Sequence, residues 1–316
     1  MIYYHASHEQ FLPSKLLELV KKAEHAGFRG VLSSDHFHPW SSSQSQGGFA
    51  WSWLGAALQS TIMSFGVVTT PSYRYHPAIL AQASATLSEM FPQRFWLCLG
   101  SGESLNESIT GLNWPNKEER NNRLKESAEI IQRLWAGETV THHGLITVEE
   151  AYLYTRPKES PLLMCAALTT ETAKWLGSWA DGLVTVASSL EQAKKIINAF
   201  KEGGGNKKPI FLKAQTSYAP NEDEALNSAW QQWKYTVLGS GANSMLRAPK
   251  MFDEASQYVR PEDMRKQVFI SSNAEEHVEW LKQLLDTGAE RISVHNVNKE
   301  QERFISFYKD RVLTEF

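Results

Sequence analysis

Segments typical of β-strands and of α-helices alternate along almost the whole chain, and this alternation restricts the fold more than any other feature of the sequence. Apolar, strand-like runs are expected at residues 2–5, 30–34, 61–69, 94–99, 162–166, 182–186, 210–216 and 291–294. Helical periodicity is expected at residues 14–25, 54–59, 77–90, 117–135, 170–179, 190–201, 222–234, 275–287 and 299–313. Such alternation is typical of parallel βαβ units. We therefore predict an α/β protein with a single (β/α)8 TIM barrel, formed by one domain over residues 1–316.

Two segments interrupt the alternation. Residues 138–154 are expected to form a surface hairpin that turns at Gly144, and residues 237–270 are expected to form an insertion of mixed helix and loop at the C-terminal face of the barrel. A doubly wound sheet is the alternative fold for a chain of this length. It would be favoured by a Gly-x-Gly-x-x-Gly motif after the first strand, and that motif is absent.

Composition restricts the partners and the location of the protein. The net charge of −3 gives no electrostatic reason to expect a nucleic acid or an anionic membrane as a partner. No apolar run approaches the length of a membrane span, and we expect no signal peptide, because a strand-like segment begins at residue 2. Cys98 and Cys165 lie in apolar runs, which favours buried thiols over a disulfide. We expect a cytoplasmic protein that acts on a small-molecule substrate.

Polar and aromatic side chains cluster directly after three neighbouring strands. The segments are residues 35–40, with Asp35, His36, His38 and Trp40, then residues 68–77, and then residues 100–107. Because the carboxyl ends of parallel barrel strands open on one face, we expect these three segments to border one shared cavity. That face is where TIM barrels carry their active sites.

His36 and Glu103 are the side chains of these segments best suited to proton transfer. An imidazole titrates near neutral pH. Glu103 follows the Gly100-x-Gly102 turn, where the backbone can approach a ligand closely, and burial there would raise the pKa of its carboxyl. Glu103 could equally cap the helix that follows it, and the sequence leaves both roles open.

A metal site at His36 and His38 is the competing interpretation of the first segment. Such a site needs further ligands from later strands. The strands at 162–166 and 182–186 end in Cys165-Ala166 and Val186-Ala187, which supply no histidine or carboxylate. We therefore expect no metal, and we set aside a metal-dependent TIM-barrel hydrolase.

With these segments assembled, the chain resembles the luciferase-like superfamily of flavin-type oxidoreductases. Within it, the chain is most similar to the branch of glucose-6-phosphate dehydrogenases that use the deazaflavin coenzyme F-420 (F420). The resemblance rests on residues 4–11, 34–40, 74–83 and 100–107, with shorter matches at 134–137, 180–182 and 293–295.

The resemblance implies a barrel whose mouth holds a flavin-like ring. His36, Trp40 and Glu103 match the residues that flank the hydride-transfer centre, as base, stabiliser of the intermediate and acid. It also implies a non-proline cis peptide at Val68–Thr69 behind the ring, a bond that costs about 3–4 kcal/mol. The residues expected to contact the cofactor are Asp35, Val68, Thr69, Thr70, Gly102, Asn106, Ala166, Ala167, Thr169 and Thr170.

The chain also departs from the sugar-phosphate branch. That branch places basic residues where this chain has Ser189, Glu254 and Gln267, and a phosphate dianion needs cations or a helix N-terminus. Glucose 6-phosphate is therefore not the expected substrate. The turn at residues 166–170 lacks the Gly-rich pattern that holds the cofactor phosphate, which favours FMN slightly over F420.

We thus expect a flavin- or deazaflavin-dependent oxidoreductase that transfers a hydride or acts as a monooxygenase on a small organic substrate. The alternative is a non-catalytic flavin-binding barrel, against which His36, Trp40 and Glu103 argue. The resemblance further implies a homodimer.

Overall fold

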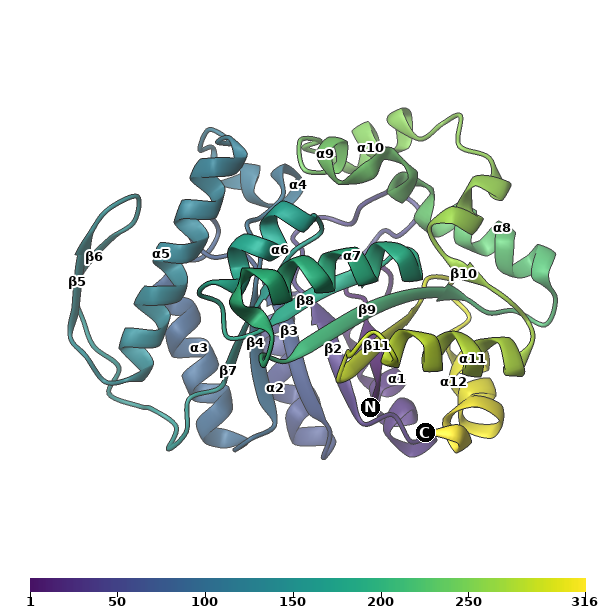
Figure 1. Ribbon diagram of the computed structural model, residues 1–316, viewed down its shortest axis with the longest axis horizontal. Helices are drawn as coiled ribbons and strands as arrows, with labels where there is room; N and C mark the ends of the chain where they lie inside the picture. The colour runs from purple at the N-terminus through teal and green to yellow at the C-terminus, as the bar shows by residue number, and fades with distance from the viewer.

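A closed ring of eight parallel strands forms the centre of the molecule, in a computed structural model that describes residues 1–316 (Figure 1). The strands are β1 (Ile2–Ala6), β2 (Gly30–Ser34), β3 (Ser64–Thr69), β4 (Phe95–Leu99), β7 (Leu162–Ala166), β8 (Leu183–Ala187), β9 (Ile210–Ser217) and β11 (Arg291–Asn296). Each strand pairs with its neighbours in this order, and β11 pairs with β1 to close the ring. The predicted (β/α)8 barrel is confirmed.

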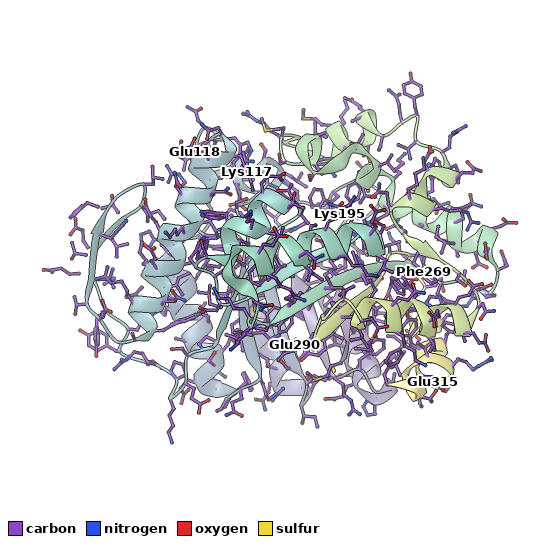
Figure 2. All side chains as sticks on the ribbon, viewed as in Figure 1. Lys117, Glu118, Lys195, Phe269, Glu290 and Glu315 are labelled. Carbon is purple, nitrogen blue, oxygen red and sulfur yellow. The ribbon has the colours of Figure 1, made fainter.

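Helices cover the outside of the ring. They are α1 (Pro13–Ala26), α2 (Ala50–Ser60), α3 (Pro77–Met90), α5 (Lys117–Trp135), α6 (Thr170–Gly177), α7 (Leu190–Phe200), α8 (Glu222–Trp233), α11 (Ala274–Leu285) and α12 (Gln301–Phe307). Proline in the first turn starts α1 and α3, and side-chain caps from Asn116, Ser189 and Asn273 start α5, α7 and α11. Figure 2 shows Lys195 on α7 and Glu118 at the start of α5, both on the outer surface.

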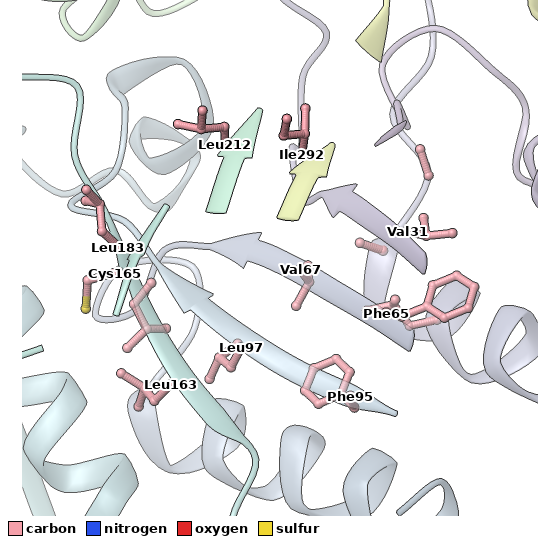
Figure 3. Packing of buried hydrophobic residues seen from close by; sticks show 14 of the residues in the cluster. Val31, Phe65, Val67, Phe95, Leu97, Leu163, Cys165, Leu183, Leu212 and Ile292 are labelled. Atoms are coloured by element: carbon pink, nitrogen blue, oxygen red, sulfur yellow. The ribbon is translucent and has the colours of Figure 1, made fainter. Parts of the chain in front are cut away.

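Alternation along each strand separates two apolar regions. Outward-facing residues such as Val67, Leu97 and Leu163 pack against the helices in a core of 62 buried residues (Figure 3). Six inward-facing residues fill the inside of the ring instead: Leu32, Trp96, Cys98, Met164, Val184 and Phe211. The barrel is therefore solid up to the middle of its strands, and a ligand site must lie beyond them.

Gly66 makes room for the largest of these inner side chains. A Cβ atom at this position would overlap the indole of Trp96 on the neighbouring strand β4. The inner packing thus depends on a missing side chain on β3, which is one use of glycine inside a strand.

Two segments interrupt the alternation of strands and helices in the structure. Residues 138–154 contain the antiparallel hairpin of β5 (Val140–His143) and β6 (Thr147–Ala151), beside α5 in Figure 1. Residues 234–270 contain α9 (Gly239–Asn243), α10 (Pro249–Ala255), short 3-10 turns and β10 (Phe269–Ile270), which pairs with the end of β9. Figure 1 shows α9 and α10 at the same end of the barrel as α4 (Ser104–Glu107).

No helix of the structure combines the length and the hydropathy that a membrane span requires.

Candidate functional site

The loop after β2 and the helix after β4 are tied together at the C-terminal end of the barrel. The Asn106 side-chain oxygen accepts hydrogen bonds from the backbone N–H groups of Phe37 and His38, at 2.9 and 3.1 Å. The His38 Nδ1 lies 2.8 Å from the backbone oxygen of Leu105. These contacts fix the backbone on which His36 and Trp40 are carried. Asn106 and His38 therefore hold the loop in place within the protein itself.

The segment after β3 joins the same assembly through a buried charge network. Asp35 accepts hydrogen bonds from the hydroxyls of Thr69, at 2.6 Å, and Tyr75, at 3.1 Å. Arg74 donates to the backbone oxygen of Asp35 and, through Nε, to Glu107 at 3.0 Å. The side chains of Arg74, Asp35 and Glu107 are almost completely buried, so this network fixes all three segments relative to one another. The three segments, which the sequence predicts at one face, are in contact in the structure.

His36 is paired with Glu9, a residue that sequence analysis did not single out. Its Nδ1 lies 2.9 Å from Glu9 Oε1, and the second carboxylate oxygen of Glu9 accepts hydrogen bonds from Ser7 and Ser34, each at 2.8 Å. Burial is the largest single effect on the pKa of His36 and lowers it, but the charge of Glu9, the hydrogen bond to Glu9 and the charge of Glu103 together outweigh burial, and the pKa is raised. Burial is the largest single effect on the pKa of Glu9 and raises it, yet the charge of His36, the hydrogen bond to His36 and the charge of Lys213 together hold this pKa well below its usual range. The only sequence signal for Glu9 was its place in residues 4–11.

Trp40 forms the aromatic side of the site. Its ring lies 5.1 Å from that of His36, edge to face, and stacks on Tyr235 with 5.1 Å between ring centroids. The ring of Phe252 from α10 approaches it edge-on at 5.4 Å. The insertion therefore holds Trp40 beside His36.

Glu103 carries a free carboxyl near the imidazole. It occupies the residue before α4, yet its side chain makes no capping hydrogen bond, so the helix-capping alternative is wrong for this residue. Burial raises the pKa of Glu103 to about 7, although the charge of His36 acts in the opposite direction. Gly102 precedes it with φ of +83°, and a Cβ there would come 2.8 Å from Thr70 Cγ2. The turn that delivers Glu103 therefore requires glycine.

Small inward-facing residues border the mouth at the ends of four neighbouring strands. Val68, Gly100, Ala166 and Val186 lie at the ends of β3, β4, β7 and β8, and each remains partly exposed although it faces the inside of the ring. Flat apolar surface of this kind, next to Thr70, suits the ring of a flavin-like cofactor. The residues present thus fit such a group at the strand ends.

One part of the resemblance is wrong. The peptide between Val68 and Thr69 is trans, and the chain contains no cis peptide bond. β3 continues in regular parallel register with β4 through Thr69, opposite Leu99, so the ordinary trans backbone satisfies the ladder here.

The predicted phosphate-binding turn is partly occupied by the protein's own contacts. The Thr169 hydroxyl oxygen accepts a hydrogen bond from the backbone N–H of Thr172 as the cap of α6. Thr170 donates to Glu171, and Ala167 is buried. Contacts of these residues with a cofactor therefore stay a prediction.

His36 and His38 do not converge. His36 faces Glu9, whereas His38 contacts the backbone of α4. No three His, Cys, Asp or Glu side chains are grouped so that they could hold a metal ion.

A barrel closed by eight parallel strands, with an acid, an imidazole and an indole at the strand ends, is the architecture of a TIM-barrel enzyme with its site at the usual face. The chain belongs to the luciferase-like monooxygenase family, whose model matches residues 4–291. It is therefore an oxidoreductase of the flavin- or F420-dependent kind, as the sequence predicted, and the non-catalytic alternative is set aside.

Two named relatives and one solved structure are similar to the chain over almost its whole length. The chain is 32% identical to an F420-dependent glucose-6-phosphate dehydrogenase of Microbacterium testaceum, over 98% of this chain and 95% of the relative. It is 34% identical to an enzyme of the same name from Segniliparus rotundus, over 97% of this chain and 95% of the relative. It is also similar to an F420-dependent secondary alcohol dehydrogenase in complex with an F420-acetone adduct, with a TM-score of 0.93, 29% identity, and coverage of 100% and 99%.

Proposed function

We propose that this enzyme transfers a hydride between F420 and the carbinol or carbonyl carbon of a small, non-phosphorylated organic substrate. One observation carries the proposal: the Glu9–His36 pair, Trp40 and the Glu103 carboxyl face one partly exposed barrel mouth.

Two relatives at 32% and 34% identity and a structure with a TM-score of 0.93, all named as F420-dependent, support F420 as the cofactor. The sequence had favoured FMN because the turn at 166–170 lacks glycine. We give the relatives and the solved structure named as F420-dependent more weight than this single departure at one turn. Val68, Thr70, Gly100 and Ala166 would border the ring.

When bound at the strand ends, F420 would supply the acceptor or donor of the hydride for the substrate carbon. His36 takes the proton of the substrate hydroxyl as the carbon–hydrogen bond breaks, and Glu9 stabilises the imidazolium that results. Trp40 packs against the substrate and excludes water. Glu103, with a pKa of about 7, holds a proton that it can donate toward the cofactor side of the mouth.

The preference for a substrate without phosphate rests on three positions. Ser189 caps α7, Glu254 is exposed on α10 with Lys250 as its ion-pair partner, and Gln267 is neutral. None of the three offers a cation to a phosphate dianion.

Titration of the purified protein with F420 and with FMN, followed by anaerobic turnover with a panel of small alcohols, tests the proposal. We expect tight binding of F420 and reduction of its visible absorption by an alcohol substrate, at substoichiometric protein. Binding of FMN alone, or binding of F420 without turnover by any alcohol or by any carbonyl compound in the reverse direction, would overturn it.

A further inference from the structure

Lys213 is a cation inside the barrel that none of the contacts described so far uses. Its neighbours in β9, Leu212 and Ala214, belong to the outer core, so the Lys213 side chain faces the inside of the ring. It lies level with Val186 of β8 and Ser293 of β11. Every other residue of β9 is fully buried, whereas Lys213 retains some exposure. Because the inside of the ring is filled by packed side chains lower down, the exposed part of Lys213 must face the open C-terminal end of the barrel.

The Lys213 ammonium has no counter-ion of its own. Its side chain makes no hydrogen bond and no ion pair, and Glu9, the nearest candidate, is already paired with His36. Burial lowers the pKa of Lys213, while Glu9 and Glu103 are close enough to act against that effect. A cation kept in an enclosed site without a bonded partner is costly, so a ligand anion that pairs with it would be stabilised there.

The surroundings define what can complete it. The Lys213 Nζ lies 5.7 Å from the ring centroid of Trp233, which in turn lies 5.3 Å from Tyr235, the residue that stacks on Trp40. An aromatic surface thus runs from Trp40 to the ammonium. Glu9 is bonded to His36, and Glu103 is largely neutral below its pKa of about 7. Lys213 is therefore a cation at the mouth that lacks a bonded anionic partner.

We propose that Lys213 binds a carboxylate of the substrate, so that the enzyme acts on small hydroxy acids and the corresponding oxo acids. This inference rests on the proposed function and names its substrate class. A single ammonium beside aromatic rings suits a monoanion, whereas a phosphate dianion is better matched by paired cations.

Binding of two probes that differ only in charge tests the subsite without turnover. Phenylacetate and phenylacetamide are titrated calorimetrically into the protein, with and without F420. We expect the wild type to bind the carboxylate at least tenfold more tightly than the amide, and Lys213→Met and Lys213→Gln to lose this preference. Lys250→Met, at a lysine exposed on α10, is the control and keeps it. An equal preference in the wild type and both Lys213 variants overturns the inference.

Turnover separates this inference from the proposed function. With F420 bound, we expect kcat/KM for 2-hydroxybutanoate to exceed that for 2-butanol at least tenfold in the wild type, and Lys213→Met to abolish the difference. A wild type that oxidises 2-butanol in preference to the acid overturns the carboxylate subsite and leaves hydride transfer with F420 standing. F420 affinity is measured in each variant, and an unchanged value shows that the barrel mouth is intact.

Discussion

At the scale of single residues, the site depends on carboxylates whose surroundings drive them in opposite directions. Glu9 is kept ionised by His36, and Glu103 is kept protonated by burial. A pair of titratable groups whose pKa values are pushed apart is a usual basis for assigning a base and an acid. The pair here is Glu9 and Glu103: Glu9 stays ionised and supports His36 as the base, and Glu103 holds the proton of the acid.

Replacement of His36 by alanine should lower kcat by about 10²–10⁴-fold, because a positioned general base contributes on that order. The F420 affinity should change by less than about threefold, since His36 contacts Glu9 and Trp40 rather than the inner strand ends. Steady-state kinetics and cofactor titration measure the two effects. Equal loss of both would remove the proton-transfer role.

Replacement of Glu9 by glutamine should shift the pH profile of the reaction. The Glu9 charge raises the pKa of His36, so its removal lowers that pKa and the acidic limb of the kcat/KM profile moves to lower pH. The exposed Glu18→Gln on α1 is the matched control and should leave the profile in place. An acidic limb that does not move in Glu9→Gln would show that the group titrating there is not His36.

Replacement of Glu103 by glutamine should stabilise the protein at alkaline pH. The folded-state pKa of about 7 exceeds the ordinary value of 4.5, so the folded protein binds the extra proton between these values and loses stability as the pH rises through them. The rise in the pKa of Glu103 from 4.5 to about 7 corresponds to a loss of ~3 kcal/mol in the free energy of unfolding at alkaline pH. We expect urea unfolding to show a gain of about 1–3 kcal/mol near pH 9 and almost none near pH 4. A gain of equal size at both pH values contradicts the raised pKa.

At the scale of secondary-structure elements, α4 acts as a clamp on the loop after β2. Asn106→Ala removes the acceptor of two backbone N–H groups, at Phe37 and His38. We expect a loss of about 1–3 kcal/mol in unfolding free energy and a fall in kcat of about tenfold or more, because His36 and Trp40 lose their fixed positions. Asn227→Ala, an exposed residue of α8, is the control. Unchanged kcat in Asn106→Ala would show that the loop is held by other contacts.

The packing inside the barrel depends on Gly66 of strand β3, which leaves room for the Trp96 indole, and replacing this glycine tests that packing. Gly66→Ala drives a methyl group into the Trp96 indole and should cost about 1–3 kcal/mol by overpacking. Adding Trp96→Leu should recover part of that loss in a double-mutant cycle. Gly55→Ala in α2 meets no neighbouring atom and should be neutral or stabilising. A Gly66→Ala variant as stable as the wild type would contradict the solid inner barrel.

The periodic elements could be predicted from sequence, and their boundaries agree closely where a cap or proline marks the end. The helices at 77–90 and 117–135 have the predicted bounds, since Pro77 and Asn116 fix their starts. The helix at 50–60 begins four residues before the predicted 54, because Phe49 gives its start no capping signal. The periodicity of apolar residues predicts which segments are helices or strands, and capping residues predict where a helix begins and ends.

At the scale of the whole molecule, the site exists because the eight strands close into a ring and so bring residues far apart in the sequence together. His36, Trp40 and Glu103 could be predicted because each follows a strand directly. Glu9 also follows a strand, β1, but it stands there without a neighbouring motif, and Lys213 lies within β9, where only the closed ring shows that its side chain faces the mouth. The trans peptide at Val68–Thr69 shows the limit of resemblance for backbone detail. The homodimer stays a prediction.

A crystal structure of the protein with oxidised F420 tests the central proposal most directly. We predict that the deazaflavin ring lies at the strand ends against Val68, Gly100 and Ala166, with its reacting face toward His36 and Trp40 and with Glu103 at its edge. A ring bound elsewhere on the molecule, or a mouth closed by packed side chains with His36 and Glu103 out of reach of the cofactor, would contradict it.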